Sequence, residues 1–120
     1  MPERVFDLED RLVDFAISVI DIVEGLPNGK ATNHISSQLV RSGTSPAPNY
    51  SESLSAESKQ DFIHKIKIAL KELRESRVWL KIIIRKRYFH EENVVESVFN
   101  ECEELIRILS ASVKTASGRK

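Results

Sequence analysis

The sequence predicts an all-α fold, an antiparallel up-and-down four-helix bundle that forms a single domain over residues 1–120. Apolar residues recur every three or four positions in four long stretches, the period of an amphipathic helix. Glycine and proline are scarce, at four each, so few residues break these stretches. Short connections make neighbouring helices antiparallel. We expect four helices, at about residues 4–24, 32–54, 58–88 and 93–114.

The first predicted helix combines one apolar seam with an acidic N-terminal half, where the helix dipole favours anions. Gly25 and the turn residues after it end this helix. The seam consists of Val5, Leu8, Leu12, Phe15, Val19 and Ile22, and we expect Val13, Ile17 and Ile20 to widen it. The acidic residues are Asp7, Glu9, Asp10 and Asp14.

The second predicted helix contains Pro46 and Pro48. Neither proline can donate a backbone hydrogen bond, and an interior proline costs a helix about 3 kcal/mol. Two outcomes are open. In one, Ser45 caps a new helix that starts at Pro46, with Asn49 in its first turn. In the other, a single helix is kinked. The local rules slightly favour the break.

The remaining helices have recognisable starts and seams. Ser58, with Asp61 three residues later, resembles a capping box ahead of the longest periodic run. The other expected caps are Thr32 or Asn33 for the second helix and Asn93, with Glu96, for the fourth. The two later seams are Phe62, Ile66, Ala69, Leu73, Leu80 and Ile83, then Val95, Val98, Cys102, Leu105 and Leu109.

Charge is balanced over the whole chain but not along it. Eighteen Lys/Arg offset eighteen Asp/Glu, so the overall basicity typical of nucleic-acid-binding proteins is absent. Residues 1–60 hold five cations and nine anions, a net charge of −4, whereas residues 61–120 hold thirteen and nine, a net charge of +4. Any nucleic-acid binding must therefore use a local face.

The sequence favours a cytoplasmic location without membrane attachment. The single cysteine, Cys102, cannot form an intramolecular disulfide. The N-terminus has no apolar signal core. No apolar run approaches the ~18–20 residues that span a membrane.

We expect a non-enzymatic protein without catalytic residues, metal or cofactor. Di-iron bundles use Glu-x-x-His motifs, but no histidine lies three residues after Glu72, Glu75, Glu101 or Glu104. Cys102 falls on an apolar seam, where a buried inert thiol is expected. The serines of the second helix lack both a nearby base and a nucleophile-elbow pattern.

From residue 61 onward the third predicted helix carries nine basic residues against three acidic ones. A basic stripe can follow a phosphate backbone while aromatic residues stack on bases, and Trp79, Tyr88 and Phe89 lie near the basic end. The alternative is a solvated helix face with i, i+4 ion pairs, which is common. The candidate nucleic-acid-binding residues are Lys67, Lys71, Arg74, Arg77, Lys81, Arg85, Lys86 and Arg87.

A polar stripe runs along the second predicted helix at helical spacing and can meet two glutamates of the third. Buried Arg and Glu side chains must be paired to be tolerated. We therefore interpret this set as a structural polar network rather than a site for chemistry. Its members are Arg41, Ser45, Asn49, Glu52, Glu72 and Glu75.

Five segments of the second and third predicted helices carry a family pattern. They are Gln38-Leu39-Val40-Arg41-Ser42, Ser45-Pro46, Asn49-Tyr50-Ser51-Glu52, Asp61-Phe62 and Ala69-Leu70-Lys71-Glu72-Leu73-Arg74-Glu75-Ser76. Together they resemble the family of four helix bundle proteins, which includes proteins encoded in intervening sequences of bacterial 23S ribosomal RNA genes. The family is similar to the accessory variability determinant of diversity-generating retroelements.

The resemblance implies an antiparallel bundle that assembles into a ring-like homopentamer. It also implies that the second helix continues through the proline pair and that the polar network is structural. In the retroelement relatives it implies a basic surface that engages nucleic acid and a reverse transcriptase. Those relatives are strongly basic, whereas this chain is neutral.

Two functions follow as hypotheses. The first is an oligomeric scaffold whose third helix binds RNA or DNA through its basic face, with a reverse transcriptase or another protein as partner. The second is a protein-interaction module without nucleic-acid binding. In that module the basic stripe meets an acidic patch of a neighbouring subunit, formed by Asp7, Glu9, Asp10 and Asp14.

Overall fold

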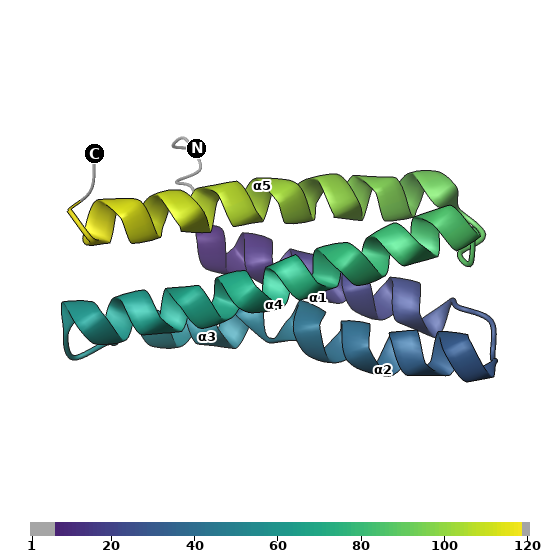
Figure 1. Ribbon diagram of the computed structural model, residues 1–120, viewed down its shortest axis with the longest axis horizontal. Coiled ribbons are helices and arrows are strands. Elements are labelled where there is room, and N and C mark those ends of the chain that lie inside the picture. Colours follow the sequence, from purple (N-terminus) through teal and green to yellow (C-terminus); the bar gives the residue numbers. More distant parts are fainter. Residues whose placement is uncertain (1–6, 119–120) are drawn as a thin grey trace, which may run out of the picture.

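The computed structural model describes residues 7–118, and all regular structure in this range is helical. The helices are α1 (Leu8–Glu24), α2 (Lys30–Thr44), α3 (Pro46–Ser53), α4 (Lys59–Lys86) and α5 (Glu92–Ala116). α2 and α3 follow one another in nearly the same direction and together form one rod of the bundle, which we call an arm. The other three arms are α1, α4 and α5, and the four arms form an antiparallel bundle (Figure 1). This confirms the predicted fold class. The predicted helix start at residue 4 and Val5 of the first seam lie outside the described residues.

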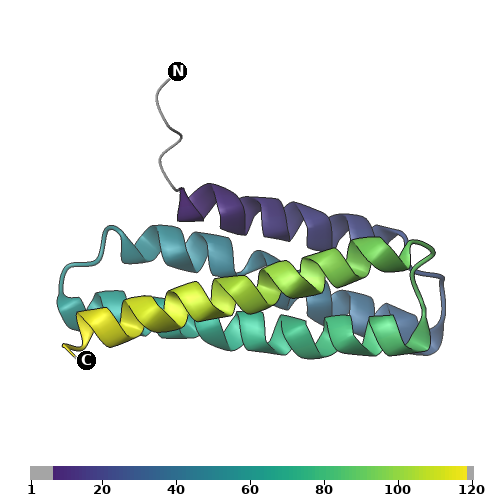
Figure 2. The same cartoon turned by 90° about the horizontal axis from the view of Figure 1, so that it is seen from above.

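The packing pattern fixes which arms are neighbours. α1 and α4 each pack against the same three helices, α2, α3 and α5. Within residues 7–118 no Cα atom of α1 lies within 8 Å of a Cα atom of α4, so these two helices lie across a diagonal of the bundle. Figure 2 shows the four arms running side by side along the long axis. The outward faces of α1 and α4 therefore point to opposite sides of the molecule.

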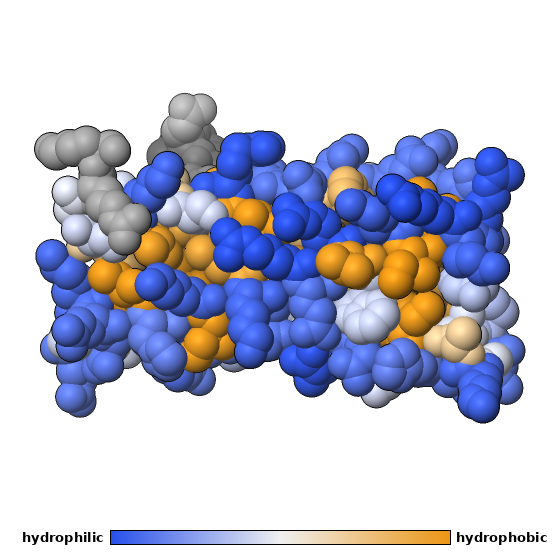
Figure 3. Space-filling view, viewed as in Figure 1, coloured by the Kyte–Doolittle hydropathy of each residue, from blue (hydrophilic) through white to orange (hydrophobic). Residues whose placement is uncertain are grey.

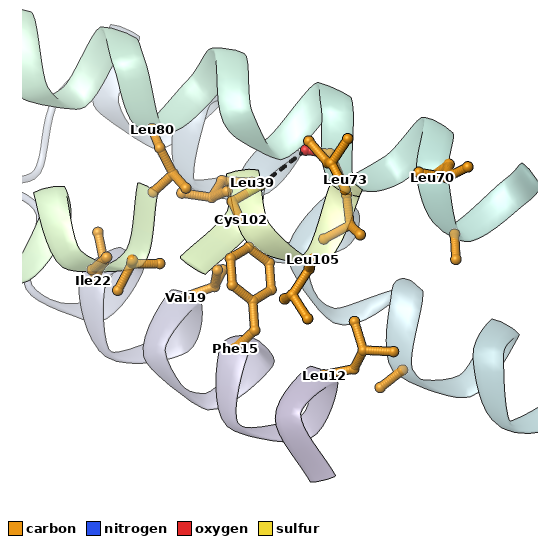
Figure 4. Packing of buried hydrophobic residues seen from close by; sticks show 14 of the residues in the cluster. Leu12, Phe15, Val19, Ile22, Leu39, Leu70, Leu73, Leu80, Cys102 and Leu105 are labelled. Carbon is orange, nitrogen blue, oxygen red and sulfur yellow. Dashed lines mark hydrogen bonds between the residues drawn. The ribbon is translucent and has the colours of Figure 1, made fainter. Parts of the chain in front are cut away.

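The core lies along the axis between the arms. Figure 4 shows side chains from α1, α2, α4 and α5 that point toward one another, with Phe15, Leu39 and Leu73 among them. These three are almost completely shielded from solvent. The seams predicted from periodicity are confirmed as core, except that Phe62 is only half-buried at the rim.

Three residues expected to widen the α1 seam instead face solvent, and that prediction is wrong. Val13, Ile17 and Ile20 are 39%, 50% and 36% exposed. Successive helical residues are rotated by about 100°, so these positions lie well away from the line through Leu12, Phe15 and Val19. The bundle covers only one face of α1, and its outer face therefore carries an apolar stripe.

The proline pair interrupts the α2–α3 arm without reversing its direction. α3 starts at Pro46, as the local rules predicted, but the side chain of Ser45 makes no capping hydrogen bond, so that part of the prediction is wrong. Ser45 nevertheless keeps helical dihedral angles (φ −70°, ψ −35°), and its amide still donates to the carbonyl of Arg41 at 3.2 Å. The arm is thus two helices joined at a local break rather than the one continuous helix that the resemblance implied, although α3 keeps the general direction of α2 (Figure 1).

Two predicted helix starts were misplaced. α2 begins at Lys30, and Thr32 lies inside it with its hydroxyl bonded to the carbonyl of Pro27 at 2.6 Å. The side chain of Asn33 instead accepts a hydrogen bond from the amide of Gly29 at 3.4 Å. α5 begins at Glu92, so Asn93 is already helical.

A glycine permits the close approach of α1 and α2. A Cβ atom added at Gly43 would lie 2.7 Å and 2.8 Å from the two methyl carbons of Val19. Real Cβ atoms do not approach other atoms so closely, and Val19 is stiff and fully buried. The spacing between these two helices therefore depends on the missing side chain of Gly43.

Candidate nucleic-acid interface

Five cations form a line along the outer side of α4. Their spacing of four, three, seven and four residues keeps them on one helical face. All are exposed, and none forms an ion pair within residues 7–118. The line covers eighteen residue steps, or about 27 Å of helix. We call these residues the α4 basic face: Lys67, Lys71, Arg74, Lys81 and Arg85.

The other three candidate residues do not belong to this face. Arg77 is partly buried and bonds Glu103 of α5 at 3.1 Å, so it ties two helices together. Lys86 lies with its ammonium 5.8 Å from the ring centre of Tyr88. Arg87 ends α4 in the left-handed conformation (φ 56°) and lies 3.7 Å from Glu92.

The aromatic residues expected near the basic end are poorly placed for stacking on bases. Phe89 is buried against Gly25, so the expectation that it supplies exposed aromatic surface is wrong. The indole of Trp79 donates to Glu75 at 3.1 Å and meets the edge of His34. Tyr88 is half-buried against the core. The α4 basic face therefore offers charge rather than a row of free rings.

The surface around α4 is nevertheless not uniformly polar. Figure 3 shows the side on which α4 and α5 lie in front, where hydrophilic and apolar groups alternate. Val78 lies midway along the α4 basic face and is half exposed. An apolar group between cations can pack against a sugar or an apolar partner while the cations meet negative charge.

The polar network predicted between α2 and α4 resolves into three separate clusters. In the first, Arg41 bonds Glu72 at 2.8 Å and Glu75 at 2.5 Å. The hydrogen bond from Arg41, then that from Trp79, holds the pKa of Glu75 below its usual value. Next to this cluster the buried hydroxyls of Ser42 and Ser76 bond each other at 2.8 Å.

The other members of the network are local. The amide of Asn49 donates to the carbonyl and the hydroxyl of Ser45, at 3.1 Å and 3.0 Å, and so bridges the break between α2 and α3. Glu52 pairs with Lys65 of α4 at 2.5 Å. The pairs of Arg41 and Glu52 therefore hold α2 and α3 against α4, whereas Asn49 and Ser45 join α3 to α2.

The apolar stripe on α1 has an acidic border. Asp14, Asp21 and Glu24 are exposed on this helix and form no ion pair with described residues. Arg11, in contrast, points to α5 and bonds Glu101 through two nitrogens at 2.7 Å. The sequence analysis missed this apolar surface. The signal for it was that Val13, Ile17 and Ile20 are out of phase with the α1 seam.

Neither a metal-holding group nor an accessible thiol is found among the described residues. No group of three or more His, Cys, Asp or Glu residues within 7–118 could hold a metal ion. Cys102 is fully buried, which raises its thiol pKa to about 12, and it donates to the carbonyl of Leu73 at 3.2 Å. None of the described helices is both long enough and apolar enough to cross a membrane.

This geometry defines a class, the antiparallel four-helix bundles with a charged outer face. Comparison with known proteins gives the family. Residues 7–111 match the family described as 23S rRNA-intervening sequence protein, and the chain belongs to that family. No curated protein matches the chain at a significant level.

A solved structure supports the same assignment. The chain is similar to a crystal structure of a protein of unknown function from the S23 ribosomal protein family of Bacteroides thetaiotaomicron. The two share 34% sequence identity and superimpose with a TM-score of 0.82. The similarity covers 90% of this chain and 99% of that one.

Proposed function

We propose that the protein is a non-enzymatic, cytoplasmic, oligomeric scaffold whose α4 basic face binds the phosphate backbone of RNA or DNA. The observation that carries this proposal is the line of five exposed cations without ion pairs to described residues. A cation that forms no ion pair is available to neutralise a phosphate. The counterions that are then released from the nucleic acid drive binding. The resemblance adds a homopentamer as the assembly and a reverse transcriptase as a protein partner.

The α4 basic face predicts how strongly binding should depend on salt concentration. If each of its five cations neutralises one phosphate, the logarithm of the binding constant should fall with the logarithm of salt concentration. The expected slope is about −3.5 for single strands and about −4.5 for duplexes. Sequence preference should be weak, because phosphate contacts carry no base information and the nearby rings are engaged elsewhere.

A matched pair of charge reversals tests the proposal. The double variant Lys71→Glu and Lys81→Glu places two anions on the α4 basic face. The control, Lys30→Glu and Lys59→Glu, changes net charge equally at the first residues of α2 and α4, where acidic residues suit the helix dipole. We expect the first variant to lose at least about tenfold more oligonucleotide affinity than the control, with an unchanged circular dichroism spectrum. Equal affinities for the two variants would contradict the proposal.

A second candidate function rests on the α1 surface. The exposed stripe of Val13, Ile17 and Ile20, bordered by Asp14 and Asp21, is complementary in charge to the α4 basic face. Because α1 and α4 lie on opposite sides of the bundle, such contacts between copies would run head to tail. This version is a protein-interaction module that does not bind nucleic acid.

Light scattering separates the two functions. The interaction module predicts oligomers that loosen at high salt and in Ile17→Glu, together with no oligonucleotide binding. The scaffold predicts a pentamer that persists at high salt, while bound nucleic acid is released and the 260 to 280 nm absorbance ratio falls.

A further inference from the structure

A recess of about 340 Å³ lies between α4 and α5, beside the α4 basic face. Its lining residues are Lys67, Leu70, Arg74, Ser110 and Val113. The two cations come from the α4 basic face, and the serine and valine come from α5. The recess is therefore the place where the basic face gains a second wall.

The charge of this recess distinguishes it from three others on the described surface. A recess between α1 and α5 is lined by Asp14 and Glu101, and one at the start of α5 by Glu91 and Glu92. A third, between Phe62 of α4 and the end of α5, has no charged lining residue. The α4–α5 recess has two cations in its lining and no carboxylate.

The side chains in the α4–α5 recess are free to bind. Neither Lys67 nor Arg74 is ion-paired within residues 7–118, and the hydroxyl of Ser110 has no hydrogen-bond partner there. Lys67 and Arg74 are two helical turns apart, and Leu70 lies between them on the same face. Both side chains line the recess together with Leu70, and Ser110 lines it from the side of α5.

This combination suits a tetrahedral oxyanion. Ammonium and guanidinium groups form charge-assisted hydrogen bonds with phosphate oxygens, and a hydroxyl can donate a further one. The floor of Leu70 and Val113 displaces water, which strengthens charged hydrogen bonds relative to those on an open surface. Lys114, exposed one turn beyond Ser110 on α5, adds positive potential at the rim.

We propose that the α4–α5 recess anchors one backbone phosphate of the nucleic acid that follows the α4 basic face. This inference rests on the proposed function, but it goes further because it makes the face unequal along its length. Lys67, Arg74 and Ser110 bind one phosphodiester between the two helices that line the recess. Lys71, Lys81 and Arg85 meet neighbouring phosphates in open solvent, where salt screens them more strongly.

The test uses two serines on one helix. Ser110→Glu puts a carboxylate between the recess cations, whereas Ser112→Glu makes the same change on the other flank of α5, in the uncharged recess. A fluorescently labelled mixed-sequence oligonucleotide is titrated against each variant in 50 mM and 200 mM salt. We expect Ser110→Glu to lower affinity at least tenfold and to reduce the salt slope by about 1 to 2, with less than a threefold loss for Ser112→Glu.

Each outcome decides something. Equal losses for the two variants, with folding intact by circular dichroism, would overturn the anchor and leave the α4 basic face standing. A wild-type protein that binds no oligonucleotide at either salt concentration would overturn the proposed function and the anchor together. A separate titration adds inorganic phosphate and follows the NMR amide signals of Ser110 and Val113. Saturation by phosphate, with unchanged oligonucleotide affinity in Ser110→Glu, would assign the recess to a free phosphate and overturn the backbone anchor.

Discussion

At the residue scale, the bundle depends on two contacts between α2 and its neighbours. Gly43 lets α2 approach Val19 of α1, and Arg41 bonds two glutamates of α4. The first contact is steric and buried, whereas the second is electrostatic and lies in a half-exposed position. Their responses to mutation and to pH should therefore differ.

Gly43→Ala should destabilise the protein by about 1 kcal/mol. Alanine gains about 1 kcal/mol over glycine in helix propensity, but overpacking against a stiff buried valine costs about 1–3 kcal/mol. Urea unfolding measures the difference. Val19→Ala removes both methyl carbons that a Cβ at position 43 would meet, so the double variant Gly43→Ala with Val19→Ala should be less destabilised than the sum of the single variants. Additive losses would mean that the two side chains do not meet.

Glu75→Gln should weaken folding at neutral pH by roughly 0.5–1 kcal/mol, the range for a partly exposed ion pair. Hydrogen bonds from Arg41 and Trp79 lower the pKa of Glu75 in the folded state, below the 4.5 of a free glutamate. Its stabilising contribution is therefore complete above pH 4.5 and is lost as pH falls through the lowered pKa. Urea unfolding at pH 7 and at successively lower pH should show that the difference in unfolding free energy between variant and wild type shrinks.

The control for this pH effect is Glu96→Gln. Glu96 is exposed on α5 and makes no ion pair with a described residue, so its replacement removes the same charge without a partner. We expect no pH-dependent difference for this variant. A difference of the same size in both variants would assign the effect to net charge rather than to Arg41.

At the element scale, hydrophobic period was enough to predict the four arms, their order and most of the core. Caps were less predictable, because a serine or threonine ahead of an apolar run is common. Ser58 does accept from the amide of Asp61 at 3.0 Å, whereas Thr32 lies inside α2 and bonds back to Pro27. Arg87 ends α4 with a positive φ that favours glycine, and nothing in the local sequence indicates this.

The candidate site was predictable only in part, because it combines residues of two helices. Periodicity along one helix places Lys67 and Arg74 on one face of α4. The position of Ser110 opposite them depends on how α4 and α5 are aligned, which is a property of two helices packed together. The outward stripe through Ile17, in contrast, could have been predicted from the sequence, because its residues are out of phase with the buried seam of α1.

Ser58→Ala should cost about 1 kcal/mol, the usual value of a side-chain N-cap. The hydroxyl of Ser58 accepts a hydrogen bond from the amide of Asp61, in the first turn of α4. That amide would otherwise have no intrahelical partner. Ser55→Ala, an exposed residue of the same connection, serves as the matched control. Thermal unfolding should show a lower midpoint for the first variant alone, and equal midpoints would contradict the capping role.

At the scale of the whole molecule, charge is separated across the bundle although the net charge is zero. Acids that form no ion pair with a described residue, such as Asp14 and Asp21, lie on α1, while the α4 basic face lies on the opposite side. A neutral chain with this separation can orient on a polyanion without being attracted strongly to every acidic surface. The same separation would let copies associate head to tail at low salt.

Cys102 provides a probe of cooperative opening for the whole bundle. Its thiol is fully buried, its pKa is raised to about 12 by that burial, and it bonds across to α4. At pH 8 a thiol reagent should therefore modify it only through unfolded molecules, at a rate proportional to the equilibrium constant of unfolding. Gly43→Ala, destabilised by about 1 kcal/mol, should then react about fivefold faster than wild type. Equal rates, or fast reaction of the wild type without denaturant, would show that α4 and α5 separate locally while the rest of the bundle stays folded.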